Sequence, residues 1–231
     1  MNQFYKIAGL RVRMDTFGRT QTQATPYLCA PFEEADIEIQ SKREAMKKWA
    51  PNLDDNDLEY MGTGTSFYRQ LLNYDGLLLH SSAVMMDGEA YLFSAPSGTG
   101  KSTHTQLWRK RFGDRAQILN DDKPALRLED GRWYAYGTPW NGKERLGCNM
   151  RTPLKHICFI ERSETNYVEP MEKSDAIDRI FNQVYMPKDP MAVMNTMQLI
   201  DRLLSCCKLW TIHCNMEPSA AETAYKTIFG K

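Results

Sequence analysis

Apolar residues in the middle of the chain form short runs separated by turn signals, a pattern typical of β-strands. The runs LLLHSSAVMM and EAYLFSA flank Asp87-Gly88, a pair favoured in two-residue hairpin turns because both central residues need positive φ. A second hairpin is predicted around Asp130-Gly131 for the same reason. Further strands are predicted at AQILNDD, HICFI and KLWTIHC.

Helices are predicted between these strands from spacing and capping signals. One runs over residues 101–112, directly after a glycine-rich segment. Others are predicted to start near Ser174, at Asp189-Pro190, where an N-cap precedes a proline, and at Ser219, where Ser219 and Glu222 would form a capping box. Strands that alternate with helices indicate an α/β fold.

The first 70 residues give weaker signals, mostly of strands and turns. A short helix is predicted near Arg43 to Trp49, ended by Pro51, and another over residues 66–73. The acidic cluster at residues 54–57 is interpreted as a solvated turn rather than a metal site. We therefore predict a small β-rich N-terminal region over residues 1–70 and an α/β domain over residues 71–231. The strands predicted in the N-terminal region lie around residues 5–14, 27–30 and 36–40.

Composition and charge are those of an ordinary globular protein. Of 231 residues, 42% are hydrophobic and 25% charged, and 29 acidic residues balance 29 basic ones. A zero net charge, with no basic run longer than Arg109 to Arg111, argues against a nucleic-acid partner. No segment approaches the roughly 18 apolar residues of a membrane span, and the first residues lack a signal-peptide pattern. We expect a cytoplasmic protein without a membrane partner.

Six cysteines are present, but none forms a C-x-x-C motif or a cysteine and histidine spacing that suits zinc. We expect them to be reduced thiols with structural roles.

The segment APSGTGKS, Ala95 to Ser102, is called the glycine loop below. It fits the phosphate-binding pattern G-x-x-x-x-G-K-[ST] at every fixed position except the first, where alanine replaces glycine. Its glycines allow backbone N–H groups to turn inward around an anion, Lys101 would reach the β- and γ-phosphates, and Ser102 would offer its hydroxyl to Mg²⁺. A structural turn would explain the glycines but not the Lys-Ser pair. The residues predicted to bind the triphosphate of ATP or a related nucleotide are Ser97, Gly98, Thr99, Gly100, Lys101, Ser102 and Thr103.

Paired carboxylates, Asp121 and Asp122, follow a predicted strand 20 residues after Lys101. Open α/β sheets keep their ligands at the carboxyl ends of strands, and hard oxygen ligands suit Mg²⁺. One carboxylate could hold the metal while the other accepts a hydroxyl proton, as phosphoryl transfer to an alcohol requires. The alternative is an acidic transition from strand to turn. The polar segment over residues 137–147 is long for a mere connection and suggests a functional loop.

Together these motifs resemble the catalytic domain of HPr kinase/phosphorylase and, more broadly, the phosphoenolpyruvate carboxykinase-like group of phosphate-loop (P-loop) proteins. His80 stands 15 residues before Ala95, as a histidine does in that kinase, and a hairpin precedes the loop. The resemblance implies a mixed sheet, with Lys101 on phosphate, Ser102 and Asp121 on Mg²⁺, and Asp122 as the base beside His80. It also proposes Glu144 as a metal ligand, from the partial motif Glu144-Arg145-Leu146-Gly147, and Arg179 as a catalytic arginine.

Residues 1–70 do not resemble the kinase's N-terminal domain, and the partial Glu144 motif argues against phosphorylase activity, so HPr is not the favoured acceptor. We predict an ATP-dependent kinase, a phosphotransferase that modifies a hydroxyl, most simply serine in a peptide or protein. The alternatives are a non-catalytic nucleotide-binding regulatory or scaffold module and a small-molecule kinase. The sequence leaves the acceptor, the nucleotide base and the oligomeric state open.

Overall fold

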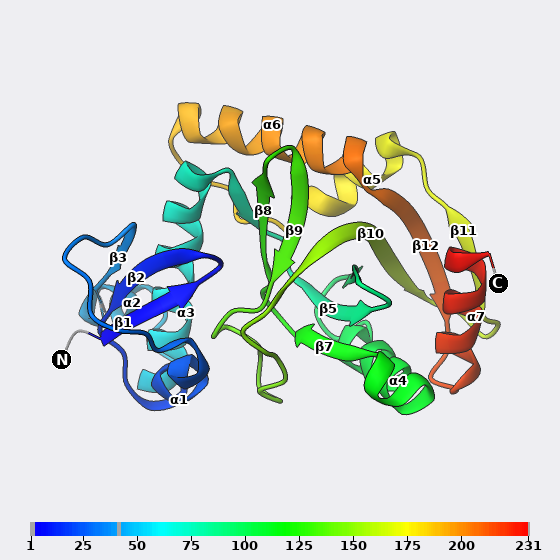
Figure 1. Cartoon of the computed structure of the whole chain (residues 1–231), viewed down its shortest axis with the longest axis horizontal. Helices are drawn as coiled ribbons and strands as arrows, with labels where there is room; N and C mark the ends of the chain where they lie inside the picture. Colours follow the sequence, from blue (N-terminus) through cyan, green and yellow to red (C-terminus); the bar gives the residue numbers. More distant parts are fainter. Residues whose placement is uncertain (1–2, 41–42, 231) are drawn as a thin grey trace.

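The computed structural model describes residues 3–40 and 43–230 as a mixed α/β fold (Figure 1). One sheet of nine strands has the order β4-β8-β9-β10-β6-β5-β7, and β12 also pairs with β10 and with β11. Its strands are β4 (Gly76–Leu78), β5 (Ser81–Met86), β6 (Glu89–Ser94), β7 (Gln117–Asn120), β8 (Ala125–Glu129), β9 (Arg132–Tyr136), β10 (Arg151–Arg162), β11 (Tyr167–Pro170) and β12 (Lys208–Cys214).

Strand direction places several loops at one edge of this sheet. Strand β10 is parallel to β6 and to β12. Strand β7 is antiparallel to β5, which is antiparallel to β6, so β7 runs in the same direction as β6. The carboxyl ends of β6, β7, β10 and β12 therefore share an edge, and the start of β5 lies there too. This is the edge at which α/β sheets bind ligands.

Two helical layers cover the sheet. Helices α5 (Lys173–Phe181) and α6 (Pro190–Cys206) pack on one face, and α4 (Lys101–Phe112) and α7 (Ser219–Phe229) pack on the other (Figure 1). Because side chains alternate along a strand, neighbouring residues of β6 enter different cores. Leu92 packs toward α5 and α6, whereas Phe93 packs against Trp108 of α4.

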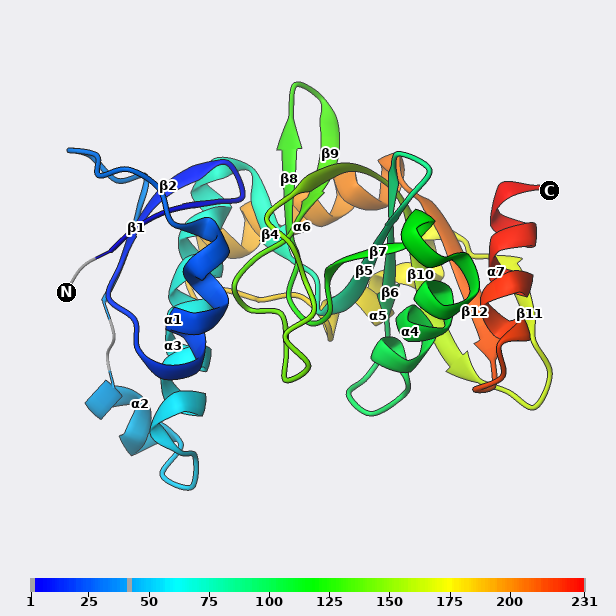
Figure 2. The ribbon, with the colours of Figure 1, turned by 60° about the horizontal axis from the view of Figure 1, so that its bottom comes forward.

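The N-terminal part lies at one end of the molecule, away from α7 (Figures 1 and 2). It consists of a sheet of β1 (Gln3–Ile7), β2 (Leu10–Met14) and β3 (Ile37–Ile39), and of helices α1 (Gly18–Ala24), α2 (Arg43–Trp49) and α3 (Asp55–Leu71). With three short strands and three helices, this part is not β-rich as predicted. Helix α1 has no apolar periodicity in GRTQTQA, and it buries Thr20, Gln23 and Ala24 through tertiary packing.

One hydrophobic core crosses the boundary predicted near residue 70. It joins residues of the N-terminal part to Ala125, Tyr136 and Trp140 from the large sheet and its connections. Trp140 stacks on Phe67 of α3 with ring centroids 4.9 Å apart, and its Nε1 donates to Thr63 Oγ1 at 3.1 Å. The two parts are thus packed through a shared, fully buried aromatic contact.

We expect a chain that lacks residues 1–70 to lose its cooperative fold, because the removal exposes Trp140, Tyr136 and Ala125 to water. Burial of large aromatic side chains contributes about 1.5–3 kcal/mol each. Near-ultraviolet circular dichroism and thermal unfolding of residues 71–231 test this expectation. A sharp transition near that of the full chain would contradict it.

Several predicted elements are confirmed. Helix α4 covers residues 101–112 as predicted, and both hairpins form, with φ of 52° at Asp87 and 48° at Asp130. The strand KLWTIHC is β12, and the helix predicted at Asp189-Pro190 is α6, where Asp189 accepts from the N–H of Ala192 at 2.8 Å.

Three local predictions were wrong. Where a strand was predicted around residues 27–30, Thr25–Tyr27 forms a 3₁₀ helix and Leu28 makes only an isolated bridge with Tyr5. The helix predicted over residues 66–73 begins at Asp55, because Asp54 caps it by accepting from the N–H of Asp57 at 2.8 Å. The acidic cluster is therefore a helix start, where negative charge is favourable, and not a turn. The capping box at Ser219 does not form, because Pro218 is the N-cap and Ser219 is already the first residue of the helix. Glu222 instead pairs with Arg111 at 3.3 Å and with Lys226 at 2.9 Å.

All six cysteines are free thiols. Among the helices that the structure describes, none combines the length and apolar character needed to cross a bilayer.

Candidate functional site

The glycine loop turns from the end of β6 into the first residue of α4. Gly98 has φ of 79° and Gly100 has φ of 128°, values that favour glycine. A Cβ at either position would meet no atom within 4 Å, so the requirement is one of backbone conformation and not of space. The N–H of Thr99 donates to Pro96 O at 3.2 Å. The loop therefore leads the chain into an α-helix N-terminus, whose first N–H groups suit an anion.

Lys101 lies over this loop with its charge largely buried. The residue is 8% exposed, and Nζ donates to Ala95 O at 2.8 Å. Burial lowers the pKa of Lys101, while the nearby carboxylates of Asp122 and Asp121 oppose that effect. An approaching anion stabilises the charge of a buried ammonium that a carbonyl oxygen holds, so Lys101 is suited to bind phosphate.

Asp121 is a buried carboxylate surrounded by hydroxyl groups. Its Oδ1 accepts from Ser82 Oγ at 2.7 Å and from Thr105 Oγ1 at 3.3 Å. Burial raises its pKa, and hydrogen bonds from Ser82, Ser102 and Thr105 counteract that rise. Of the ion pairs found within the described residues, none includes Asp121. A buried carboxylate beside the Ser102 hydroxyl, with no cationic side chain paired to it, fits a bound divalent cation.

Within the part of the chain that the structure describes, no three histidine, cysteine, aspartate or glutamate residues cluster as a metal site. Mg²⁺ in nucleotide sites needs only one or two protein ligands beside phosphate and water. Ser102 and Asp121 fit that mode. Glu144 lies exposed on the loop over residues 137–147 and lines a cavity that Ser102 and Asp121 also line. It could therefore bind a metal ion only from the rim of that cavity.

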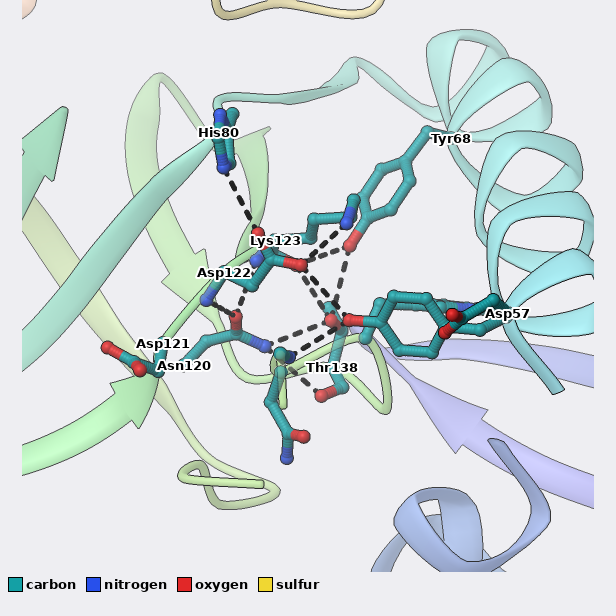
Figure 3. A network of polar contacts seen from close by, with 12 residues as sticks. Asp57, Tyr68, His80, Asn120, Asp121, Asp122, Lys123 and Thr138 are labelled. Atoms are coloured by element: carbon teal, nitrogen blue, oxygen red, sulfur yellow. Dashed lines mark hydrogen bonds and ion pairs between the residues drawn. The ribbon is translucent and has the colours of Figure 1, made fainter. Parts of the chain in front are cut away.

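Asp122 has three polar partners (Figure 3). Its Oδ1 lies 3.1 Å from His80 Nε2, and its Oδ2 lies 2.5 Å from Lys123 Nζ and accepts from the Tyr60 hydroxyl at 3.1 Å. Burial acts to raise its pKa, but the hydrogen bond from His80 and the charge of Lys123 outweigh it and lower the pKa of Asp122 far below its ordinary value. Asp122 is therefore ionised across the neutral pH range.

His80 connects Asp122 to the end of α5. Its Nδ1 lies 2.9 Å from Gln183 Oε1, and its backbone N–H donates to Gln183 O at 2.7 Å. Because an ionised carboxylate only accepts hydrogen bonds, His80 Nε2 carries a proton toward Asp122. The three residues form a chain that fixes the orientation of the imidazole.

The turn after β7 is held by its own side chain. Asn120 Oδ1 accepts from the N–H groups of Asp122 at 2.9 Å and Lys123 at 2.7 Å, an Asx-turn that presents both aspartates at the sheet edge. Asn120 Nδ2 donates to Thr138 O at 3.1 Å, and the Tyr68 hydroxyl lies 3.1 Å from Thr138 Oγ1 (Figure 3). The turn is thus tied to α3 and to the segment after β9.

The glycine loop and the aspartates open onto one cavity of 580 Å³. We call it the acidic cavity. Among the nucleotide-binding residues predicted from the sequence, Thr99 does not line it and lies in a cavity on the other side of the loop. The residues around the acidic cavity are Arg19, Leu53, Asp57, Tyr60, Met61, His80, Ser97, Gly98, Gly100, Lys101, Ser102, Thr103, Asp121, Asp122, Lys123, Gly142, Lys143 and Glu144.

Arg179 is placed elsewhere. Its guanidinium forms an ion pair with Glu161 and lies 5.8 Å from the centroid of the Phe159 ring. It lines a separate cavity with Pro96 and Gln183, and not the acidic cavity. The structure therefore does not bring Arg179 together with Lys101, because the Arg179 guanidinium is paired with Glu161 in this separate cavity.

The N-terminal part supplies one wall that the sequence did not predict. Tyr60 donates to Asp122 and accepts from the N–H of Gly142 at 2.9 Å. The Arg19 guanidinium stacks over the Tyr60 ring at 4.0 Å and pairs with Asp57 at 3.0 Å. Gln23 of α1 donates to Gly142 O at 2.9 Å, so α1 and α3 together hold the loop over residues 137–147.

One signal could have revealed this wall. Tyr60, Phe67 and Leu71 follow helical spacing, and Asp54 begins their helix as an N-cap. A helix predicted from Asp54 onward would include Tyr60 on its buried face, but it would not predict the contact of Tyr60 with Asp122.

Fold and site together define a mixed α/β protein with a glycine loop and a pair of aspartates at one ligand-binding sheet edge. The family described as SynChlorMet cassette protein ScmC matches residues 52–197. Because the match covers more than half of the chain, the protein belongs to this ScmC family.

Other comparisons add little. No curated protein matches the chain. Among solved structures, the Hpr(Ser) kinase/phosphatase from Coxiella burnetii is similar with a TM-score of 0.38 and 10% identity, over 66% of this chain and 97% of that one. This is a distant structural similarity only, and it carries no argument about activity.

Proposed function

We propose that this protein is an ATP-dependent kinase that transfers the γ-phosphoryl group to a hydroxyl, with serine in a peptide or protein as the favoured acceptor. The observation that carries the proposal is the acidic cavity, where Lys101 and Ser102 at a helix N-terminus face Asp121 and Asp122. A phosphate-binding group, candidate metal ligands and an ionised carboxylate in one cavity are the parts that phosphoryl transfer requires.

Each residue has a separate role in the proposed reaction. Lys101 and the N–H groups of the glycine loop bind the phosphates, and Ser102 and Asp121 would hold Mg²⁺. Bound Mg²⁺ supplies charge neutralisation on the β- and γ-phosphates. Asp122 orients the acceptor hydroxyl and takes its proton. The acceptor oxygen bonds to the γ-phosphorus as the bond from that phosphorus to the β–γ bridging oxygen breaks, and ADP leaves with the electron pair.

The low pKa of Asp122 determines what kind of base it is. It is always ionised but weak, because His80 and Lys123 stabilise its charge. Phosphoryl transfer passes through a loose transition state in which the hydroxyl proton needs little early removal. Positioning of the hydroxyl is therefore the larger part of the role of Asp122.

A scaffold module that only binds nucleotide is the rival from another class. Asp121, beside Ser102, would serve as the metal ligand, so nucleotide binding alone needs no general base at Asp122. The chain keeps Asp122 ionised through His80, Lys123 and Tyr60, which favours the enzyme.

Incubation of the purified protein with Mg²⁺ and γ-labelled ATP, with serine peptides and small alcohols in separate arms, tests the proposal. We expect label on a serine peptide. Transfer to small alcohols alone would indicate a small-molecule kinase. ATP binding without transfer to any acceptor would support the scaffold.

Replacement of His80 by alanine should lower turnover by about 10- to 100-fold while ATP affinity changes less than about threefold, because His80 contacts Asp122 but not the glycine loop. Gln183→Ala, which removes the amide that orients His80, should show a smaller loss in the same direction. Steady-state kinetics and calorimetry check both. Equal, small changes in turnover and affinity would make His80 a structural residue.

A further inference from the structure

A second cavity lies on the opposite side of the glycine loop from the aspartates. It has a volume of 420 Å³, within the range of about 300–1,000 Å³ usual for small-molecule sites. Its walls come from the carboxyl ends of β10 and β12, at Ile160, Arg162 and Cys214, and from Met216 in the segment after β12. We call it the β12 cavity, and the proposed phosphoryl transfer gives it no role.

The two cavities border the same part of the loop. Gly98, Gly100 and Thr103 line both of them. A triphosphate on the loop, with its terminal phosphate toward Lys101 and Asp122, has its other end directed past Thr103. One extended ligand can therefore occupy both cavities, with its phosphates on the acidic side and its remaining part in the β12 cavity.

The lining of the β12 cavity suits a flat, largely apolar group. Ile160 and Cys214 are buried at its wall, and Met216 is 79% exposed at its rim. The guanidinium of Arg162 donates to Gly98 O, and its Nε donates to Thr99 O at 3.1 Å, which holds the planar cation beside the loop. Planar guanidinium groups stack on aromatic rings, and methionine adapts to them.

Two polar side chains of the cavity, Asn215 and Ser163, already form hydrogen bonds within the protein. Asn215 Nδ2 donates to Glu164 O at 3.0 Å, and its Oδ1 accepts from the N–H of Glu217 at 3.0 Å and from Asn166 Nδ2 at 3.0 Å. Ser163 Oγ accepts from the N–H of Thr165 at 3.3 Å. Away from the loop threonines Thr99 and Thr103, the far wall therefore offers few groups to bind the hydrogen-bonding edge of a base.

We propose that the β12 cavity binds the nucleoside of the phosphoryl donor, with the base packed against Arg162, Ile160 and Met216. This inference rests on the proposed function, since the donor phosphates lie on the glycine loop. Because the base is recognised by packing and not by base-specific hydrogen bonds, the site accepts different bases. ATP and GTP therefore bind with dissociation constants within about tenfold of each other.

Calorimetry with Mg²⁺ and three ligands, ATP, GTP and inorganic tripolyphosphate, tests this assignment. Ser163→Trp places a bulky side chain at the cavity wall and is expected to weaken ATP more than about tenfold, with tripolyphosphate affinity unchanged. Met216→Ala should weaken ATP by about two- to tenfold. The control is Met191→Ala, which removes another exposed methionine, on α6 and outside the β12 cavity, and should change neither affinity.

The outcomes separate the inference from the proposed function. If wild-type protein binds tripolyphosphate as tightly as ATP, or if Ser163→Trp weakens both ligands equally, the β12 cavity is not the nucleoside site although the loop binds phosphate. If the dissociation constants of ATP and GTP differ by more than about 100-fold, recognition of the base by packing alone is wrong. If no ligand binds the wild-type protein, the proposed function itself fails, and the nucleoside site with it.

Discussion

Replacing Lys101 by alanine should weaken Mg·ATP binding at least about 100-fold while the fold survives. The ammonium of Lys101 lies over the glycine loop on the side of the aspartates, where it donates to the carbonyls of Ala95 and Pro96. A charge-assisted hydrogen bond to phosphate in a buried site contributes about 1.5–3 kcal/mol, and the lost charge attraction adds to it. Removal of a largely buried charge also relieves a desolvation cost, so stability should not fall greatly.

Titration calorimetry together with thermal unfolding measures both effects. Lys143→Ala is the matched control, because Lys143 lines the same cavity but is exposed and lies on another loop. We expect its ATP affinity to stay within about threefold of wild type. An unchanged ATP affinity in folded Lys101→Ala would contradict the assignment of the loop to phosphate.

Asp122→Asn should leave ATP affinity nearly unchanged and lower phosphoryl transfer by about 10² to 10⁴, because the variant loses both the orientation of the acceptor hydroxyl and the acceptor of its proton. Asparagine keeps the size of the side chain but cannot take the hydroxyl proton. It also loses the charge that pairs with Lys123 and attracts the His80 N–H, so the acceptor hydroxyl would lose its oriented partner.

The neighbouring Asp121→Asn distinguishes the two carboxylates. A neutral amide is a poorer ligand for a hard cation, so this variant should need a higher Mg²⁺ concentration for half-maximal activity. Turnover of each variant is measured against Mg²⁺ concentration, with thermal unfolding as the check that both fold. Full turnover by Asp122→Asn would show that another group accepts the proton. If turnover depended on Mg²⁺ concentration identically in both variants, the assignment of Asp121 to the metal and of Asp122 to the acceptor hydroxyl would be wrong.

Local signals predicted the elements that carry the site. The glycine loop followed by a helix over residues 101–112, the hairpin at Asp87-Gly88 and the strand before Asp121 all occur where the sequence places them. These features depend on near neighbours: positive φ at glycine, an N-terminal helix turn and an apolar run. Such preferences act over a few residues and remain legible in one sequence.

The N-terminal prediction failed for a physical reason. Helix α1 is polar except for Gly18 and Ala24, and it is held by packing on α3 and by the hydrogen bond of Gln23 to Gly142. Helix α3 was predicted too short because an acidic N-cap was interpreted as a turn. Element type in such segments depends on contacts made far along the chain, which propensity alone does not contain.

By itself, the sequence determined the local chemistry of this protein: a glycine loop with Lys101 and Ser102, and two aspartates at a strand end. Only the tertiary structure decided which residues surround them. It placed Tyr60 on Asp122, paired Arg179 with Glu161 behind the loop, and opened the β12 cavity between strands distant in sequence. The reason is that backbone preferences are local, whereas the direction of a side chain and the partner it meets are set by strand order and by packing across the whole chain.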